Sequence, residues 1–221
     1  RLQGNLLLKP VGLTGKGIMK LDLAEVSSNF FSFNSTWFKA DTANLSVFDD
    51  SEKLAFSAKN LRANIDLSDR EGMFFSNGLG SYVNFPASEY ICYIDQLKWE
   101  MDKEQLTFGN KDVLSKSRSQ FISTNKNQDS LSFYAKSADY SLRDYVINAS
   151  GVDSIAIADA IIYPDSAKLI VSRNAEIQTL KNSKLLLDTL VRYHEFDNAT
   201  VDIFGKNNYE ASGDYIYIDA L

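Results

Sequence analysis

Cysteine and histidine are nearly absent from this chain of 221 residues, which holds one of each, Cys92 and His194. A single cysteine cannot form an internal disulfide, and one histidine cannot build a multi-histidine metal site. We therefore expect no transition metal and no other cofactor. Cys92 lies between Ile91 and Tyr93, a position typical of a buried small apolar side chain, and His194 is expected to be an ordinary strand residue that is solvated or hydrogen-bonded.

An excess of positive charge and long apolar runs are also missing. The chain has 23 Lys and Arg against 29 Asp and Glu, a formal net charge of −6. Because nucleic-acid affinity is built from clustered Lys and Arg, no nucleic-acid partner is expected. No apolar run approaches the roughly 18–20 residues of a transmembrane helix, so no such segment is expected either.

Catalytic motifs are equally scarce, and the sequence assigns no catalytic residue. The Gly15-Lys16 pair fails the phosphate-loop pattern, which needs glycine at Pro10 and Ser or Thr at Gly17. The acidic run 49–52 is expected to cap a turn. One enzymatic alternative remains, in which stacked aspartates form a composite calcium site like that of polysaccharide lyases; its candidates are Asp139, Asp153, Asp159 and Asp165.

What the chain does have is the composition of a β-protein. It contains 14 Phe, 11 Tyr and 2 Trp among many Val, Ile, Thr and Ser, which favours half-buried pleated surfaces. Apolar and polar residues alternate with a period of two, as in Leu45-Ser46-Val47, Ile155-Ala156-Ile157 and Val201-Asp202-Ile203. Helix competes in 174–196, but Lys184 interrupts the apolar stripe there, so strands are favoured. In 138–147 periodicity does not decide between helix and strand.

The sequence divides into three parts. Residues 1–108 form an N-terminal β segment, 109–130 are polar and typical of a loop or linker, and 131–221 form a C-terminal β segment. The two segments could be separate domains or one continuous stack.

Weak internal repetition favours the stack. Asparagine followed by a small residue recurs at Asn182-Ser183 and Asn198-Ala199, with a looser version at Asn174-Ala175. Spacings of about 16–22 residues match one rung of a β-solenoid, and asparagine can turn corners in the left-handed conformation. The sequence therefore predicts an all-β fold of stacked β-rungs, a β-solenoid or open β-roll, with a two-domain β-sandwich as the alternative.

Several segments resemble known families. The runs 121–133, 157–165 and 209–215 resemble segments of very large uncharacterised envelope proteins of the Bacteroides group. The runs 38–45 and 56–61 are loosely similar to OstA-like repeats of lipopolysaccharide-transport proteins, which stack β-rungs into a lipid-holding groove. These resemblances imply an extracytoplasmic place in a bacterial cell envelope, in the periplasm or at the outer surface, and bring no catalytic residues.

The expected function is therefore a non-enzymatic structural or assembly module, with a carbohydrate-active enzyme or glycan-binding module as the alternative. A groove could hold lipid or glycan, and the candidate ligand-binding residues are the clustered aromatics Tyr82, Tyr90, Tyr93 and Trp99. The strand-like run Tyr215–Ile218 near the end of the chain suggests a fragment whose partners are further β-rungs of the same longer chain. It also suggests self-association through this C-terminal strand.

Overall fold

The computed structural model describes residues 1–109, 119–187 and 194–217, without the side chains of 216 and 217. The chain is all-β, with 68% of residues in strands and antiparallel sheets. Its described helices are four single 3₁₀ turns: η1 (Met101–Lys103), η2 (Lys126–Gln128), η3 (Asp165–Ala167) and η4 (Arg173–Ala175). No described helix has the length and apolar character needed to cross a membrane.

The first sheet has fifteen described strands. They are β1 (Leu2–Lys9), β2 (Gly12–Lys20), β3 (Ala24–Phe33), β4 (Trp37–Phe48), β5 (Leu54–Asp66), β6 (Glu71–Ser76), β7 (Tyr82–Phe85), β8 (Tyr90–Tyr93), β9 (Gln96–Glu100), β10 (Gln105–Gly109), β11 (Ser119–Ser123), β12 (Ser132–Ala135), β13 (Ser137–Ser141), β14 (Val146–Ser150) and β17 (Lys168–Val171). The second sheet consists of β15 (Ile155–Ile157), β16 (Ala160–Tyr163), β18 (Leu180–Leu187), β19 (His194–Gly205) and β20 (Asn208–Tyr217).

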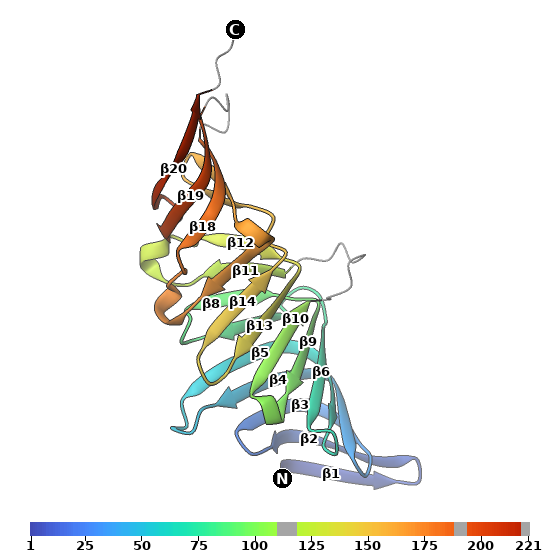
Figure 1. Cartoon of the computed structure of the whole chain (residues 1–221). Helices are drawn as coiled ribbons and strands as arrows, with labels where there is room; N and C mark the ends of the chain where they lie inside the picture. Colours follow the sequence, from blue (N-terminus) through green and yellow to red (C-terminus); the bar gives the residue numbers. More distant parts are fainter. Residues whose placement is uncertain (110–118, 188–193, 218–221) are drawn as a thin grey trace.

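The first sheet branches at β5. Residues 61–66 of β5 pair with β6, which begins an arm that continues through β9, β10, β13, β14 and β17. Residues 57–59 pair instead with β7, which begins a second arm through β8, β11 and β12. The strands succeed one another along an elongated molecule, from β1 at the bottom of Figure 1 to β20 at the top.

Bulges bend the long strands at this branch. The ladders slip by one residue at 29–30 of β3, 41–42 of β4 and 59–60 of β5, so the irregularities lie on neighbouring strands. Asn60, between the two halves of β5, has φ +56°. Polar side chains bind the backbone groups that the bulges release: Asn44 Oδ1 accepts from the Asn60 amide at 3.1 Å, and Asn77 Nδ2 donates to the Asp41 carbonyl at 2.8 Å.

The core fills the space between the two arms with aromatic rings. Phe85 of β7 contacts Phe108 of β10 at a centroid distance of 5.3 Å and Tyr140 of β13 at 4.7 Å, both edge-to-face. Phe121 of β11 stacks on Phe133 of β12 at 5.0 Å. All of these side chains are at most 2% exposed. The period-two alternation read from the sequence is therefore confirmed, because its apolar positions face this interior.

The preference for strand over helix in 174–196 is confirmed in its described part, which contains η4, β18 and the start of β19. The ambiguous segment 138–147 is a hairpin, in which the turn 142–145 joins β13 to β14. The polar stretch 109–130 differs from the expected loop, because Ser119–Ser123 form β11 with Phe121 fully buried. Its residues 110–118 lie outside the described part. β10, which precedes this stretch, and β13, which follows it, are paired directly in the first sheet. The stretch therefore does not separate two sheets.

Candidate functional site

Of the four aromatic residues expected to bind a ligand, two face outward and two face the core. Tyr82 and Tyr93 face outward from the β7–β8 hairpin, and Tyr93 is 46% exposed. Tyr90 and Trp99 face the core instead and are 0% and 5% exposed. The cluster of four is therefore corrected to two candidate contacts, Tyr82 and Tyr93.

Tyr90 is held in the core by a chain of hydrogen bonds. Its hydroxyl donates to Gln128 Oε1 at 3.1 Å, and Gln128 Nε2 donates to the Ala175 carbonyl at 2.6 Å. Burial raises the pKa of Tyr90 well above its ordinary value, because an ionised phenolate would lose its hydration there. These contacts join β8 to η2 and η4 inside the molecule.

A third tyrosine joins the outward pair. Tyr134 of β12 is 48% exposed and lies opposite Gln120 of β11, which itself lies opposite Tyr93 of β8. Tyr134 is 41 positions from Tyr93 in sequence, so local clustering of aromatics could not find it. Its alternation with buried Phe133 and Ala135 does show that it faces outward, but only the strand register places it beside Tyr93.

These tyrosines belong to a longer row that crosses the strands at right angles, which we name the outer track. From the N-terminal side it consists of Ile18, Ser27, Asn44, Lys59, Tyr82, Tyr93, Gln120 and Tyr134, one residue from each of β2, β3, β4, β5, β7, β8, β11 and β12. Asn44 and Lys59 are neighbours across the bulge of β5, and Tyr82 and Tyr93 continue the β7–β8 register one residue beyond the pair Val83–Cys92. The Lys59 amine lies 5.7 Å from the centre of the Tyr82 ring, a cation–π distance. No member of the outer track is acidic.

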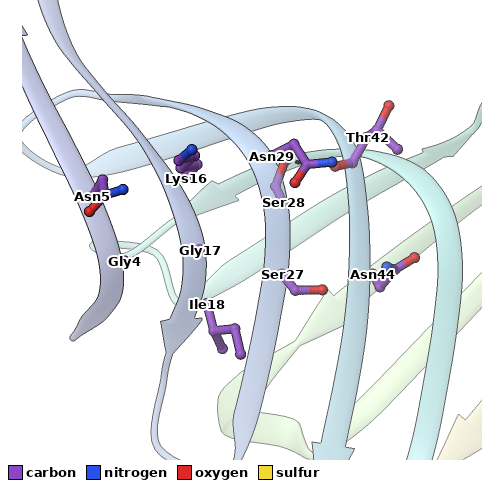
Figure 2. Close-up of a pocket in the computed structure, with 10 residues that line it drawn as sticks. All are labelled: Gly4, Asn5, Lys16, Gly17, Ile18, Ser27, Ser28, Asn29, Thr42 and Asn44. Carbon is purple, nitrogen blue, oxygen red and sulfur yellow. Dashed lines mark hydrogen bonds between the residues drawn. The ribbon is translucent and has the colours of Figure 1, made fainter.

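A polar hollow of about 460 Å³ lies at the N-terminal end of the outer track. Figure 2 shows Ile18, Ser27 and Asn44 on successive strands there, with Asn29 and Thr42 above them. Lys16 and Asn5 line the other side.

The walls of the hollow depend on the bulges and on two paired glycines. Ser28 Oγ donates to the Thr42 carbonyl at 2.7 Å and accepts from the Phe30 amide at 3.1 Å, which fixes the bulge of β3. Gly4 and Gly17 lie opposite each other where β1 and β2 approach closely. A Cβ on Gly17 would lie 2.2 Å from the Gln3 carbonyl oxygen, so only glycine fits at this position of β2.

The edge strand β1 forms a second candidate surface. Its inward side continues the apolar columns of the core: Leu6 lies in register with Gly15, and Gly15 with Phe31 and then Ala40. Phe31 and Ala40 are at most 1% exposed, whereas Leu6 is 57% exposed and Leu8, further along β1, is 78% exposed. Among the described strands only β2 pairs with β1, so one edge of β1 and much of its inward face are uncovered.

The strand β20 forms the corresponding edge at the other end of the molecule. It pairs with β19 alone among the described strands, and Tyr215 is 49% exposed. The side chains of Ile216 to Ile218, on which the expected self-association of the C-terminal strand rests, lie outside the described part. That expectation stays a prediction.

The single cysteine and the single histidine of the chain both lie in structural positions. Cys92 is fully buried, and burial raises the pKa of its thiol well above the ordinary value. His194 Nδ1 forms a hydrogen bond with the Tyr215 hydroxyl at 2.5 Å, and the two rings stack at a centroid distance of 5.7 Å. The expectations of a buried cysteine and a hydrogen-bonded strand histidine are confirmed.

The four aspartates considered for a composite calcium site are not brought together. Within the ranges that the structure covers, no three His, Cys, Asp or Glu side chains are grouped so as to hold a metal ion. Asp139 instead accepts a hydrogen bond from Thr107 Oγ1 at 2.8 Å across β10 and β13, and Asp159 interacts with Tyr209.

Comparison of the chain with protein-family models, curated proteins and solved structures gives no match.

Proposed function

We propose that this chain is a non-enzymatic structural segment of a bacterial cell-envelope protein, in which it forms part of a longer stack of β-rungs. In this proposal β1 is not a terminal strand, and a further antiparallel strand pairs with its open edge. The added strand would belong to a neighbouring rung, and its apolar side chains would extend the core past Leu6 and Leu8.

The exposed inward face of β1 is the observation that carries the proposal. Leu6 and Leu8 stand at the exposed end of two columns that become buried toward β4, at Phe31 and Ala40 in one and at Phe38 in the other. Full burial of each leucine would contribute about 1.5–3 kcal/mol. An edge strand with an apolar inward face is also a template for pairing, unless charges, proline or a covering element blunt it. Between Leu2 and Lys9 the only charge is Lys9 itself, at the end of the strand.

The chain path supports stacked rungs rather than two separate sandwiches. After β6, successive strand pairs alternate between the two arms: β7–β8, β9–β10, β11–β12 and β13–β14. Each pair lies on the preceding pair of its own arm, through β9–β6, β11–β8 and β13–β10. Such nearest-neighbour stacking is how repeat architectures bury a continuous core.

The resemblance to very large Bacteroides envelope proteins supports the extracytoplasmic location in this proposal. The lipid-holding groove of OstA-like repeats is not part of it, because rings around Phe85 and Phe121 fill the space between the arms. A structural role needs only this packed interior and edges that accept neighbours.

A matched pair of variants tests whether the inward face of β1 takes a further strand. We expect the whole chain to self-associate with rising concentration, because a second copy can occupy the open edge in place of a rung. Leu6→Lys should weaken this association by about tenfold or more, since it places a charge on the inward face. Leu7→Lys is the control, because Leu7 has a similar exposure of 51% but faces outward. Sedimentation velocity measures both.

A strict monomer at high concentration would contradict the open edge. Equal effects of the two substitutions would contradict the role of the inward face. Circular dichroism and thermal unfolding of each variant show whether the fold is intact, so that loss of structure is not mistaken for loss of association.

A further inference from the structure

The outer track provides aromatic faces at a regular spacing. Neighbouring strands lie about 4.8 Å apart, so Tyr82 and Tyr93 are one spacing apart, and Tyr93 and Tyr134 are two spacings, or about 9.6 Å, apart. The three rings stand in a line that runs along the stack and across the strands. Gln120 lies between the last two rings and adds an amide that can donate and accept hydrogen bonds.

The same line continues into groups that bind hydroxyls. Beyond Tyr82 the outer track passes Lys59 and Asn44 and reaches the hollow of Figure 2. The volume of this hollow, about 460 Å³, lies within the range of small-ligand sites, and amides and hydroxyls of Asn5, Asn29, Ser27 and Thr42 line it. One end of the outer track is therefore suited to stacking, and the other to polar contacts.

The combination of aromatic rings and polar groups on one face favours one class of extended ligand over others. A peptide strand would bind at a sheet edge through its backbone, whereas the outer track lies on a face. A nucleic acid would need a groove rich in positive charge beside the rings, but the track and its hollow hold only Lys59 and Lys16, on a chain of net charge −6. A sugar chain presents apolar C–H faces and hydroxyl edges in alternation, which matches both kinds of group.

We propose that the outer track binds one linear glycan chain along the stack. The rings of Tyr82, Tyr93 and Tyr134 stack on sugar faces, and the polar groups of the hollow bind hydroxyls at one end of the chain. Lys59 and Lys16 favour a glycan that carries carboxylates, since no acidic residue of the track opposes it. Binding is non-covalent and stands independently of whether β1 pairs with a further strand.

Calorimetric titration with two oligosaccharides tests the proposal. The probes are a galacturonate hexasaccharide, which carries carboxylates, and cellohexaose, which is neutral. We expect both to bind, the galacturonate several-fold more tightly. Tyr93→Ala and Tyr134→Ala should each weaken binding of both probes about tenfold, and Lys59→Ala should weaken only the galacturonate.

Phe75→Ala is the matched control, because Phe75 forms a cation–π pair with Arg62, 5.0 Å from its ring, on the arm that begins at β6. It should bind both probes like the unmodified chain. Three results would each overturn the proposal: no binding of either glycan, unchanged binding by the two tyrosine variants, or tighter binding of a single-stranded oligonucleotide than of either glycan. Tyr93 and Tyr134 are about half exposed, so their replacement leaves the core intact, which thermal unfolding checks.

Discussion

At the scale of single residues, Tyr145 joins segments that are far apart in sequence. Its hydroxyl donates to Asp49 Oδ2 at 2.7 Å, and its carbonyl accepts from the buried Ser88 Oγ at 2.8 Å. The Arg173 guanidinium lies 4.0 Å from its ring centre. Tyr145 also adopts φ +60°, an unfavourable value for an aromatic residue, which these contacts compensate.

Of the contacts around Tyr145 and Asp49, the sequence reveals only the local ones. The expectation that 49–52 forms a capped turn is confirmed, because Asp49 Oδ1 accepts from the backbone amides of Ser51 and Lys53 at 2.9 and 3.0 Å. Capping is local and therefore visible in sequence. The bond from Tyr145 spans 96 positions, and no local pattern encodes it.

Replacement of Tyr145 by phenylalanine should change the pH dependence of stability. The hydrogen bond from Tyr145 is the largest cause that holds the pKa of Asp49 below its ordinary value, and the backbone amide of Lys53 adds to it. A lowered folded-state pKa gives stability above the unfolded value of about 3.9 that is lost as pH falls through the folded value. Tyr145→Phe should therefore raise the pKa of Asp49 and lose stability at pH 7.

The stability difference between the variant and the parent should shrink as the pH falls through the lowered folded-state pKa of Asp49, because the carboxyl is then protonated in both. NMR titration of the Asp49 carboxyl and urea unfolding at several pH values measure the two effects. A difference that is constant with pH would show that the lost contact does not act through Asp49.

At the scale of elements, left-handed asparagines build the bends. Asn60 in β5, Asn182 in β18 and Asn198 in β19 have φ between +50° and +56°, and each lies where a ladder slips by one residue. The asparagines at 182 and 198 were expected at corners between rungs, but they lie inside β18 and β19, where they form bulges. Asn174, the looser instance, is also left-handed, with φ +57°.

The sequence predicted the strands well because burial alternates along each one, as at Leu45 and Val47. It could not predict the branch at β5, since that depends on a bulge at Asn60 and on two different partners for the halves of one strand. Of the candidate site, the sequence reveals the opposite faces of Tyr90 and Tyr93, because their odd spacing along one strand separates them. It does not reveal Tyr134, which reaches the outer track only through the register of β11 and β12.

Substitutions at Asn182 should separate backbone conformation from side-chain contacts, because this residue is exposed. Asn182→Gly should leave the free energy of unfolding within about 0.5 kcal/mol, since glycine adopts positive φ readily. Asn182→Val should lose about 1–2 kcal/mol, because a β-branched residue is strained at φ +52°. Urea unfolding monitored by circular dichroism measures both. Equal stability of the two variants would mean that the bulge relaxes at this position.

At the scale of the whole molecule, the described aromatic ring contacts of the core gather around Phe85 and Phe121, between the two arms. Phe85 contacts rings from both arms, whereas the edge strands β1 and β20 present exposed side chains and pair on one side only among the described strands. The second sheet meets the first through backbone bonds near η2, such as the Lys206 amide to the Gln128 carbonyl at 3.0 Å. Strands at the edges therefore have fewer apolar contacts to lose on local opening than strands in the middle.

Hydrogen exchange should therefore reveal a gradient of protection from the middle of the molecule to its edge strands. Amides of β7, β10 and β13 should exchange most slowly, and those of β1 and β20 most rapidly, because local opening costs least where fewest apolar contacts are broken. Phe85→Ala should lower the free energy of unfolding by about 3–5 kcal/mol and reduce protection on both arms. The β19–β20 hairpin, outside the contacts of Phe85, should keep its protection. Phe204→Ala is the control with little expected effect, since Phe204 is 47% exposed. A uniform loss of protection across all strands in Phe85→Ala would mean instead that the two sheets unfold as one cooperative unit.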